Sequence, residues 1–131
     1  MTIVVGYVPT PEGDAALTAA IDEARRRSET LHVLNAARGD ASGDTNFLDD
    51  EAVATLRGRL ADSGVGFEVQ QLVRGRDAAD EIVEAAERVG ASLVVIGIRR
   101  RTPTGKLLFG SQAQKVLLEA DRPVLAVKAA R

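Results

Sequence analysis

Two kinds of hydrophobic pattern alternate along this chain. Short apolar runs rich in β-branched residues are typical of strands buried on both faces of a sheet. Longer segments with apolar residues three and four positions apart are typical of amphipathic helices. The runs predict strands at 2–8, 31–36, 67–73, 93–96 and 123–127. The longer segments predict helices at 11–24, 47–60, 78–89 and 111–120.

The order of these elements predicts the fold class. Strands alternate with helices along the whole chain, so the protein is expected to be α/β, with a five-stranded parallel sheet, right-handed crossovers and helices on both faces. The length of 131 residues fits one domain spanning 1–131, since domains commonly hold about 100–150 residues.

Local signals support the helix boundaries. Thr10 can cap the first helix, with Pro11 at its first position, where a missing N–H is harmless. Asp77 is expected to cap the third helix, with Asp80 or Glu81 reaching back to it, and Gly90 to end that helix.

Composition excludes several classes of protein. Only 3% of residues are aromatic, so the core must be built from Val, Leu, Ile and Ala. The chain has no cysteine, which excludes disulfides, thiolate catalysis and cysteine metal sites. No run approaches the roughly 20 apolar residues of a membrane span, and the first residues lack a signal-peptide pattern. A cytoplasmic location and no membrane partner are predicted.

Charge is distributed unevenly along the chain. The net charge of −2 argues against nucleic acid as the main partner. The segment 88–118 holds basic residues and no acid, whereas 40–51 is acidic. One interpretation is that each segment is a solvated surface. The other is that the basic loop binds an acidic protein partner or the acidic segment of this chain.

A candidate ligand site follows from the predicted topology. In open α/β sheets, ligands bind beyond the carboxyl ends of the strands, where the strand order reverses. The loops 7–10, 36–40 and 97–110 are expected to meet there. The last of them leads into a helix starting with Ser111, whose first N–H groups can hold a phosphate. The predicted phosphate contacts are the N–H groups of Ser111, Gln112 and Ala113, assisted by Arg100 or Lys106.

The spacing of residues in this loop carries a family resemblance. Gly97, Gly110 and Ser111 match the first glycine and the final Gly-Ser of a Gly-x2-Gly-x9-Gly-(Ser/Thr) motif. The opening I-V-V-G-Y-V-P-T-P-E-G-D-A-A-L and the closing A-D-R-P-V-L-A-V-K also fit. Over essentially its whole length the chain resembles the universal stress protein family.

The resemblance implies a fold and a function. Family members have a Rossmann-like sandwich of the adenine nucleotide alpha hydrolase type and act as regulators in stress responses. Those with the motif bind ATP or AMP, with magnesium accompanying ATP. The phosphates would lie on the glycine loop and the adenine against the first two strand ends, here Val8 and Ala36. Members commonly form homodimers through the last strand, here Pro123–Val127.

Two departures from the motif leave an alternative open. Arg100 replaces the second glycine, where a side chain must contact the phosphate or block the site. Val8 stands where family members often have an Asp near the ribose. The alternative is therefore a dimeric protein-interaction module that binds no nucleotide, its pocket blocked by Arg100 and Val8.

No catalytic or metal-binding residue is predicted. His32 is the one histidine, lies inside the second predicted strand, and is interpreted as structural. The carboxylates of 40–51 miss the spacing of a calcium loop. Slow ATP hydrolysis is a third and weaker hypothesis, since no general base can be identified.

Overall fold

The structure is a computed structural model that describes residues 1–37, 47–99 and 110–129. The candidate residues Arg100 and Lys106 therefore lie outside the described residues, as do positions 38–40 of the loop expected at 36–40. The strands are Thr2–Gly6 (β1), Thr30–Ala37 (β2), Phe67–Val73 (β3), Leu93–Ile98 (β4) and Val124–Lys128 (β5). The helices are Pro11–Arg27 (α1), Asp50–Ser63 (α2), Ala78–Val89 (α3) and Ser111–Glu119 (α4).

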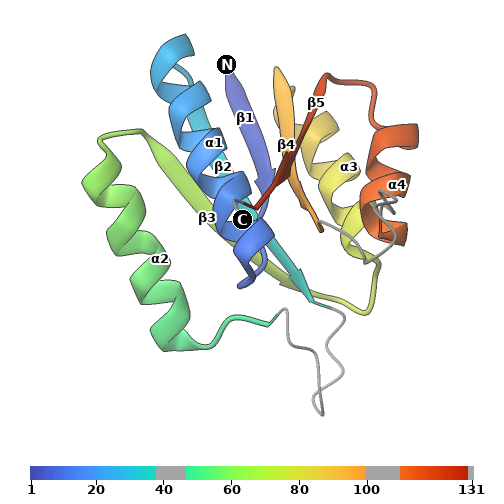
Figure 1. Ribbon diagram of the computed structural model, residues 1–131, viewed down its shortest axis with the longest axis horizontal. Coiled ribbons are helices and arrows are strands. Elements are labelled where there is room, and N and C mark those ends of the chain that lie inside the picture. The colour runs from blue at the N-terminus through green and yellow to red at the C-terminus, as the bar shows by residue number, and fades with distance from the viewer. Residues whose placement is uncertain (38–46, 100–109, 130–131) are drawn as a thin grey trace.

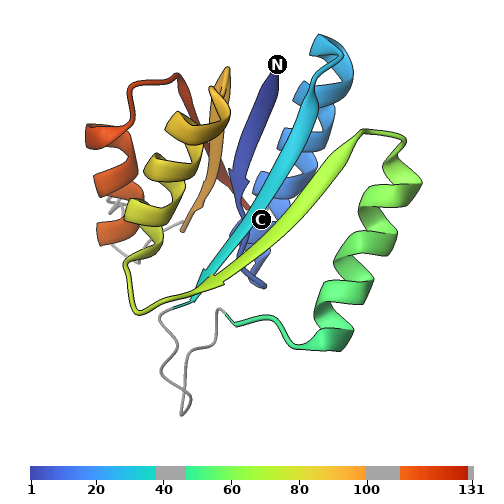
Figure 2. The ribbon, with the colours of Figure 1, turned by 180° about the vertical axis from the view of Figure 1, so that it is seen from behind.

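The strands form one parallel sheet in the order β3-β2-β1-β4-β5. The strand order reverses between β1 and β4, which makes the space beyond their carboxyl ends the topological switch point. Helices α1 and α2 cover one face, and α3 and α4 the other (Figures 1 and 2). The predicted parallel α/β fold with helices on both faces is confirmed.

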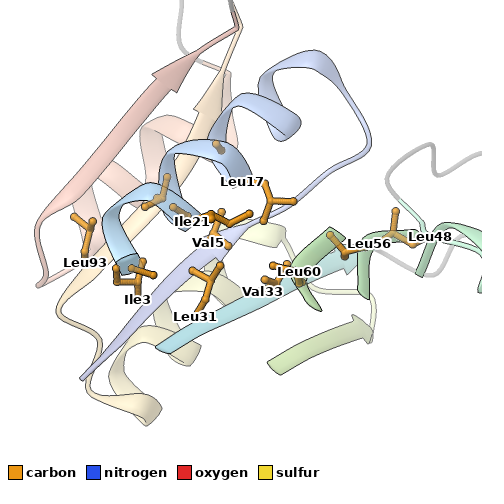
Figure 3. Close-up of a cluster of buried hydrophobic side chains, with 14 residues drawn as sticks. Ile3, Val5, Leu17, Ile21, Leu31, Val33, Leu48, Leu56, Leu60 and Leu93 are labelled. Carbon is orange, nitrogen blue, oxygen red and sulfur yellow. The ribbon is translucent and has the colours of Figure 1, made fainter. Parts of the chain in front are cut away.

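Each face of the sheet has its own hydrophobic cluster. Side chains of α1 and α2 pack on one face against alternate residues of β1, β2 and β4, as Figure 3 shows. The intervening residues, such as Val4 and Leu34, pack on the other face against α3 and α4. Because both faces of these strands are covered, their sequences are nearly continuous apolar runs.

The first helix begins as its sequence indicates. The side chain of Thr10 accepts a hydrogen bond from the Gly13 N–H, with Pro11 as the first helical residue. A Cβ atom at Gly13 would lie 1.8 Å from the carbonyl oxygen of Val8. The turn from β1 into α1 is thus too tight for any side chain at Gly13.

Some predicted boundaries are wrong. β1 ends at Gly6, two residues before Val8, and β4 continues to Ile98. The second helix does not include Phe47, which is half exposed. It begins at Asp50 because the Asp49 carboxylate accepts the N–H of Ala52 and caps it. No described helix is both long and apolar enough to cross a membrane.

Candidate functional site

A cavity of about 150 Å³ lies at the switch point; we call it the switch-point cavity. Its walls come from the carboxyl ends of three strands and from the first two turns of α3 and α4. The lining residues are Gly6, Tyr7, Val8, Leu34, Ala36, Ala78, Ile82, Ile96, Gly97, Gln112, Ala113 and Val116. The cavity is therefore where the topology predicts a ligand.

Most of the described candidate residues meet at this cavity. Val8, Ala36, Gly97, Gln112 and Ala113 all line it. The remaining described candidates, at 110 and 111, form the start of α4 next to these lining residues. Five residues from four separate segments are thus brought to one place, while their role as ligand contacts stays a prediction.

The described lining of the switch-point cavity is uncharged. Its side chains are aliphatic apart from those of Tyr7 and Gln112. With Val8 in the loop after β1, none of the described lining residues supplies a carboxylate. A flat, uncharged group fits such walls, and its polar atoms would have to be met mainly by main-chain groups.

The start of α4 offers main-chain donors beside the cavity. By helix geometry, the N–H groups of the first turn have no carbonyl four residues earlier within the helix to accept them. The first turn carries no acidic residue. A Cβ atom at Gly110 would meet nothing within 4 Å among the described residues, and its φ of −60° suits any residue. Neither packing against the described residues nor the backbone conformation therefore requires glycine at position 110.

Gly97 has a different physical role. A Cβ atom on it would lie 2.3 Å from the carbonyl oxygen of Glu12 in the first turn of α1. The glycine therefore permits α1 to lie close against β4, on the face opposite α3 and α4. Packing explains this motif position independently of any ligand.

The first turns of α3 and α4 are joined by hydrogen bonds. The side-chain oxygen Oε1 of Gln112 accepts the N–H of Ala79 at 2.9 Å. Asp77 occupies the N-cap position of α3, but its side chain makes no capping hydrogen bond. Asp77 thus occupies the predicted N-cap position, but the capping acceptor comes from Gln112 on α4. The side chains of Asp80 and Glu81, predicted to reach back to Asp77, pair instead with Lys115 and with Arg74 and Arg76.

An ion pair lies one turn further along α4. Lys115 Nζ lies 2.9 Å from Asp80 Oδ1 and 3.6 Å from Asp77 Oδ2. The hydrogen bond to Asp80 raises the pKa of Lys115 above its ordinary value, with smaller contributions from the surrounding acids.

A buried carboxylate anchors the β3–α3 connection, and the sequence analysis missed this role. Glu81 is 2% exposed and lies on α3. Its oxygens accept hydrogen bonds from Arg74 and Arg76, in the connection that follows β3. Arg76 also pairs with Glu84 at 2.8 Å, and this hydrogen bond lowers the pKa of Glu84 below its ordinary value.

Side-chain amides connect the end of β2 with the neighbouring segments. Asn35 is fully buried and donates from Nδ2 to the carbonyl oxygen of Tyr7 at 2.9 Å. Its Oδ1 accepts from Gln71 Nε2, which also donates to the carbonyl oxygen of Leu48. The polar Asn within a largely apolar strand was the available sequence signal, since a buried amide requires partners.

Three further polar side chains lie away from the cavity lining. His32 is buried on β2, with its Nε2 3.0 Å from Gln70 Oε1. The acidic residues Asp49 and Glu51 line a separate hollow of about 430 Å³ beside α1 and α2. The described part of the acidic segment thus lies on the other face of the sheet. No group of three or more potential metal ligands occurs among the residues that the structure describes.

Comparisons with known proteins agree on one family. Residues 1–128 match the model of the universal stress protein family. A universal stress protein of Mycolicibacterium smegmatis is 51% identical over 126 residues, covering 96% of each chain. The structure of a universal stress protein from Archaeoglobus fulgidus superposes with a TM-score of 0.82 at 36% identity, covering 98% of each chain. Another from that organism, in complex with dAMP, gives a TM-score of 0.69 at 29% identity, again over 98% of each chain.

Proposed function

Since the chain belongs to the universal stress protein family, we propose that it binds an adenine nucleotide at the switch-point cavity and acts as a stress-response regulator. The base would occupy the uncharged cavity beside Val8 and Ala36. The phosphate of AMP, or the phosphates of ATP with magnesium, would lie at the N–H groups of Ser111, Gln112 and Ala113.

One observation carries this proposal. The first turn of α4, open at Gly110 and free of acidic residues, lies next to a cavity at the strand-order reversal. The apolar walls suit a base, and helix N-terminal donors suit an anion. The dAMP complex of the related A. fulgidus protein supports the same class of ligand.

The uncharged walls of the switch-point cavity also predict that the affinity for the nucleotide is modest. The side chain of Val8 cannot accept a hydrogen bond from a ribose hydroxyl, whereas a carboxylate there would. A hydrogen bond to a charged group contributes about 1.5–3 kcal/mol, or roughly ten- to a hundredfold in affinity. Arg100 and Lys106 are proposed to assist at the phosphate.

The test is calorimetric titration of the purified, nucleotide-stripped protein with AMP, adenosine, inorganic phosphate, and ATP with and without magnesium. AMP and ATP are expected to bind. The absence of heat and of a thermal shift at millimolar AMP and ATP would overturn the proposal. It would favour the interaction module, in which the basic loop engages an acidic protein partner.

A matched pair of variants tests the location. Asp and Asn are both good N-cap residues, so Gly110→Asp and Gly110→Asn should both preserve α4. Only the Asp variant adds a negative charge where the phosphate would bind. It should weaken AMP binding about tenfold more than the Asn variant does, while adenosine binding should change equally in both.

We further propose a cytoplasmic homodimer formed through Pro123–Val127. β5 lies at an edge of the sheet, and Leu125 on it is 37% exposed. An unpaired edge is a template for pairing with a second copy. Pro123, which lacks an N–H, lies just before the strand and so costs no hydrogen bond within it. Sedimentation at micromolar concentration should show a dimer; a monomer would contradict this pairing.

A further inference from the structure

Helix α4 is held in place by few buried side chains. It has nine residues, of which Val116 is buried. An isolated helix of this length is marginal in water, so its neighbours must fix its position. Among the described elements, α4 packs mainly against α3. The contacts between these two helices therefore decide where the first turn of α4 lies.

Gln112 makes the contact nearest to the proposed phosphate position. Its Oε1 lies 2.9 Å from the Ala79 nitrogen, in the first turn of α3. An N–H group requires an acceptor, so the side-chain oxygen rather than its NH₂ group must face α3. Because Asp77 provides no side-chain cap, Gln112 satisfies a helix donor for which no other described residue supplies an acceptor.

Lys115 supports the same arrangement from one turn away. Residues three apart lie on one side of a helix, so Gln112 and Lys115 both face the first turn of α3. Lys115 pairs with Asp80 and Asp77. One neutral and one charged contact thus join the starts of the two helices, both of which line the switch-point cavity.

We infer that Gln112 is a positioning residue, whose side chain caps α3 and thereby holds the first-turn N–H groups of α4 at the switch-point cavity. The sequence suggests a role for its main-chain N–H alone; the structure adds a separate role for its side chain. The importance of the Gln112 side chain for phosphate binding rests on the proposed function, whereas the anchoring of α4 is a property of the ligand-free protein.

Amide hydrogen exchange of the ligand-free protein tests the anchoring. Two amides serve as probes: that of Ala79, and that of Gln114, which donates to the carbonyl oxygen of Gly110 at 3.0 Å and closes the first turn of α4. In Gln112→Met, which lacks the acceptor, the protection of both amides should fall about three- to tenfold. In Gln112→Glu, which retains an acceptor, both should stay protected.

Gln114→Met is the matched control, since Gln114 lies on the same helix and has no side-chain hydrogen bond to any described residue. Its own N–H remains in the variant and can still be measured. Both probes should keep their protection. Unchanged protection of the Gln114 amide in Gln112→Met would overturn the inference, as would an equal loss in Gln114→Met.

Ligand titrations then separate positioning from general destabilisation. Gln112→Met should weaken AMP binding about three- to tenfold and leave adenosine binding nearly unchanged, because α4 faces the phosphate. An equal loss for both ligands would indicate general damage and overturn the positioning role. If the wild-type protein binds neither ligand, the proposed function fails, and the exchange data still decide whether Gln112 anchors α4.

Discussion

The main chain at Gly97 lies so close to Glu12 that an added Cβ atom would be 2.3 Å from the Glu12 carbonyl oxygen. The end of β4 and the first turn of α1 are therefore in direct main-chain contact. Gly58, in contrast, lies on α2, where a Cβ atom would meet nothing within 4 Å among the described residues.

These two glycines should respond oppositely to the same substitution. Gly97→Ala forces α1 away from β4 and should lower the free energy of unfolding by about 1–3 kcal/mol. Gly58→Ala removes a flexible residue from a helix interior and should raise it by about 0.5–1 kcal/mol. Urea denaturation measures both, and equal stability of Gly97→Ala and wild type would contradict the close contact.

A carboxylate at position 8 should strengthen nucleotide binding. Val8→Asp places an acceptor at the cavity wall where a ribose hydroxyl would lie, and AMP affinity should rise about ten- to a hundredfold. Calorimetry with AMP, adenosine and free adenine provides the comparison. The affinity for adenosine should rise similarly, whereas the affinity for adenine should not, because adenine has no ribose. A gain for adenine would place the ribose elsewhere.

Removing the two arginines around the buried Glu81 carboxylate and neutralising that carboxylate should lower the free energy of unfolding by different amounts. The double variant Arg74→Met, Arg76→Met leaves Glu81 buried without these cations, and should lower the free energy of unfolding more than Glu81→Gln does. Glu81→Gln leaves two arginines that can still reach water, and should cost about 1–3 kcal/mol. Denaturant titration of both variants provides the test; a larger loss in Glu81→Gln would argue against this explanation.

Tyr7 should ionise at a higher pH than an unperturbed tyrosine. Partial burial and, next, the adjacent Asp14 carboxylate raise the pKa of Tyr7 above its ordinary value of 10.0, and the phenol donates to Asp14. Its contribution to stability should therefore be fully present below pH 10 and be lost as pH rises through the folded-state pKa.

Ultraviolet absorbance isolates this titration, because the chain has one tyrosine and no tryptophan. The midpoint should lie above that of the unfolded protein and should fall in Asp14→Asn, while burial keeps it somewhat raised. Glu12→Gln is a control on the same helix and should leave the midpoint unchanged. A wild-type midpoint at the unfolded value would contradict the structure.

The fold follows from local patterns, because strands covered on both faces produce nearly continuous apolar runs. The predicted strand topology likewise indicated a candidate site beyond the carboxyl ends of the strands, where the switch-point cavity lies. The spacing of Gly97, Gly110 and Ser111 indicated the family. The sequence analysis did not find the pairing of Gln112 with Ala79, which are 33 positions apart. It also missed the role of Glu81, because an inward-facing carboxylate reveals its partners only after β3 and α3 are packed.

The separation of the two hydrophobic clusters has a consequence for protein engineering. Ile3 and Val5 belong to one cluster and Val4 to the other, so the clusters share strands but no side chains. The cluster under α1 and α2 can therefore be redesigned for heat resistance while the aliphatic walls beside α3 and α4 keep their original residues. Tyr7 must also be kept, because it packs against this cluster and lines the switch-point cavity. A thermostable scaffold with an unaltered switch-point cavity is accessible from that side of the sheet.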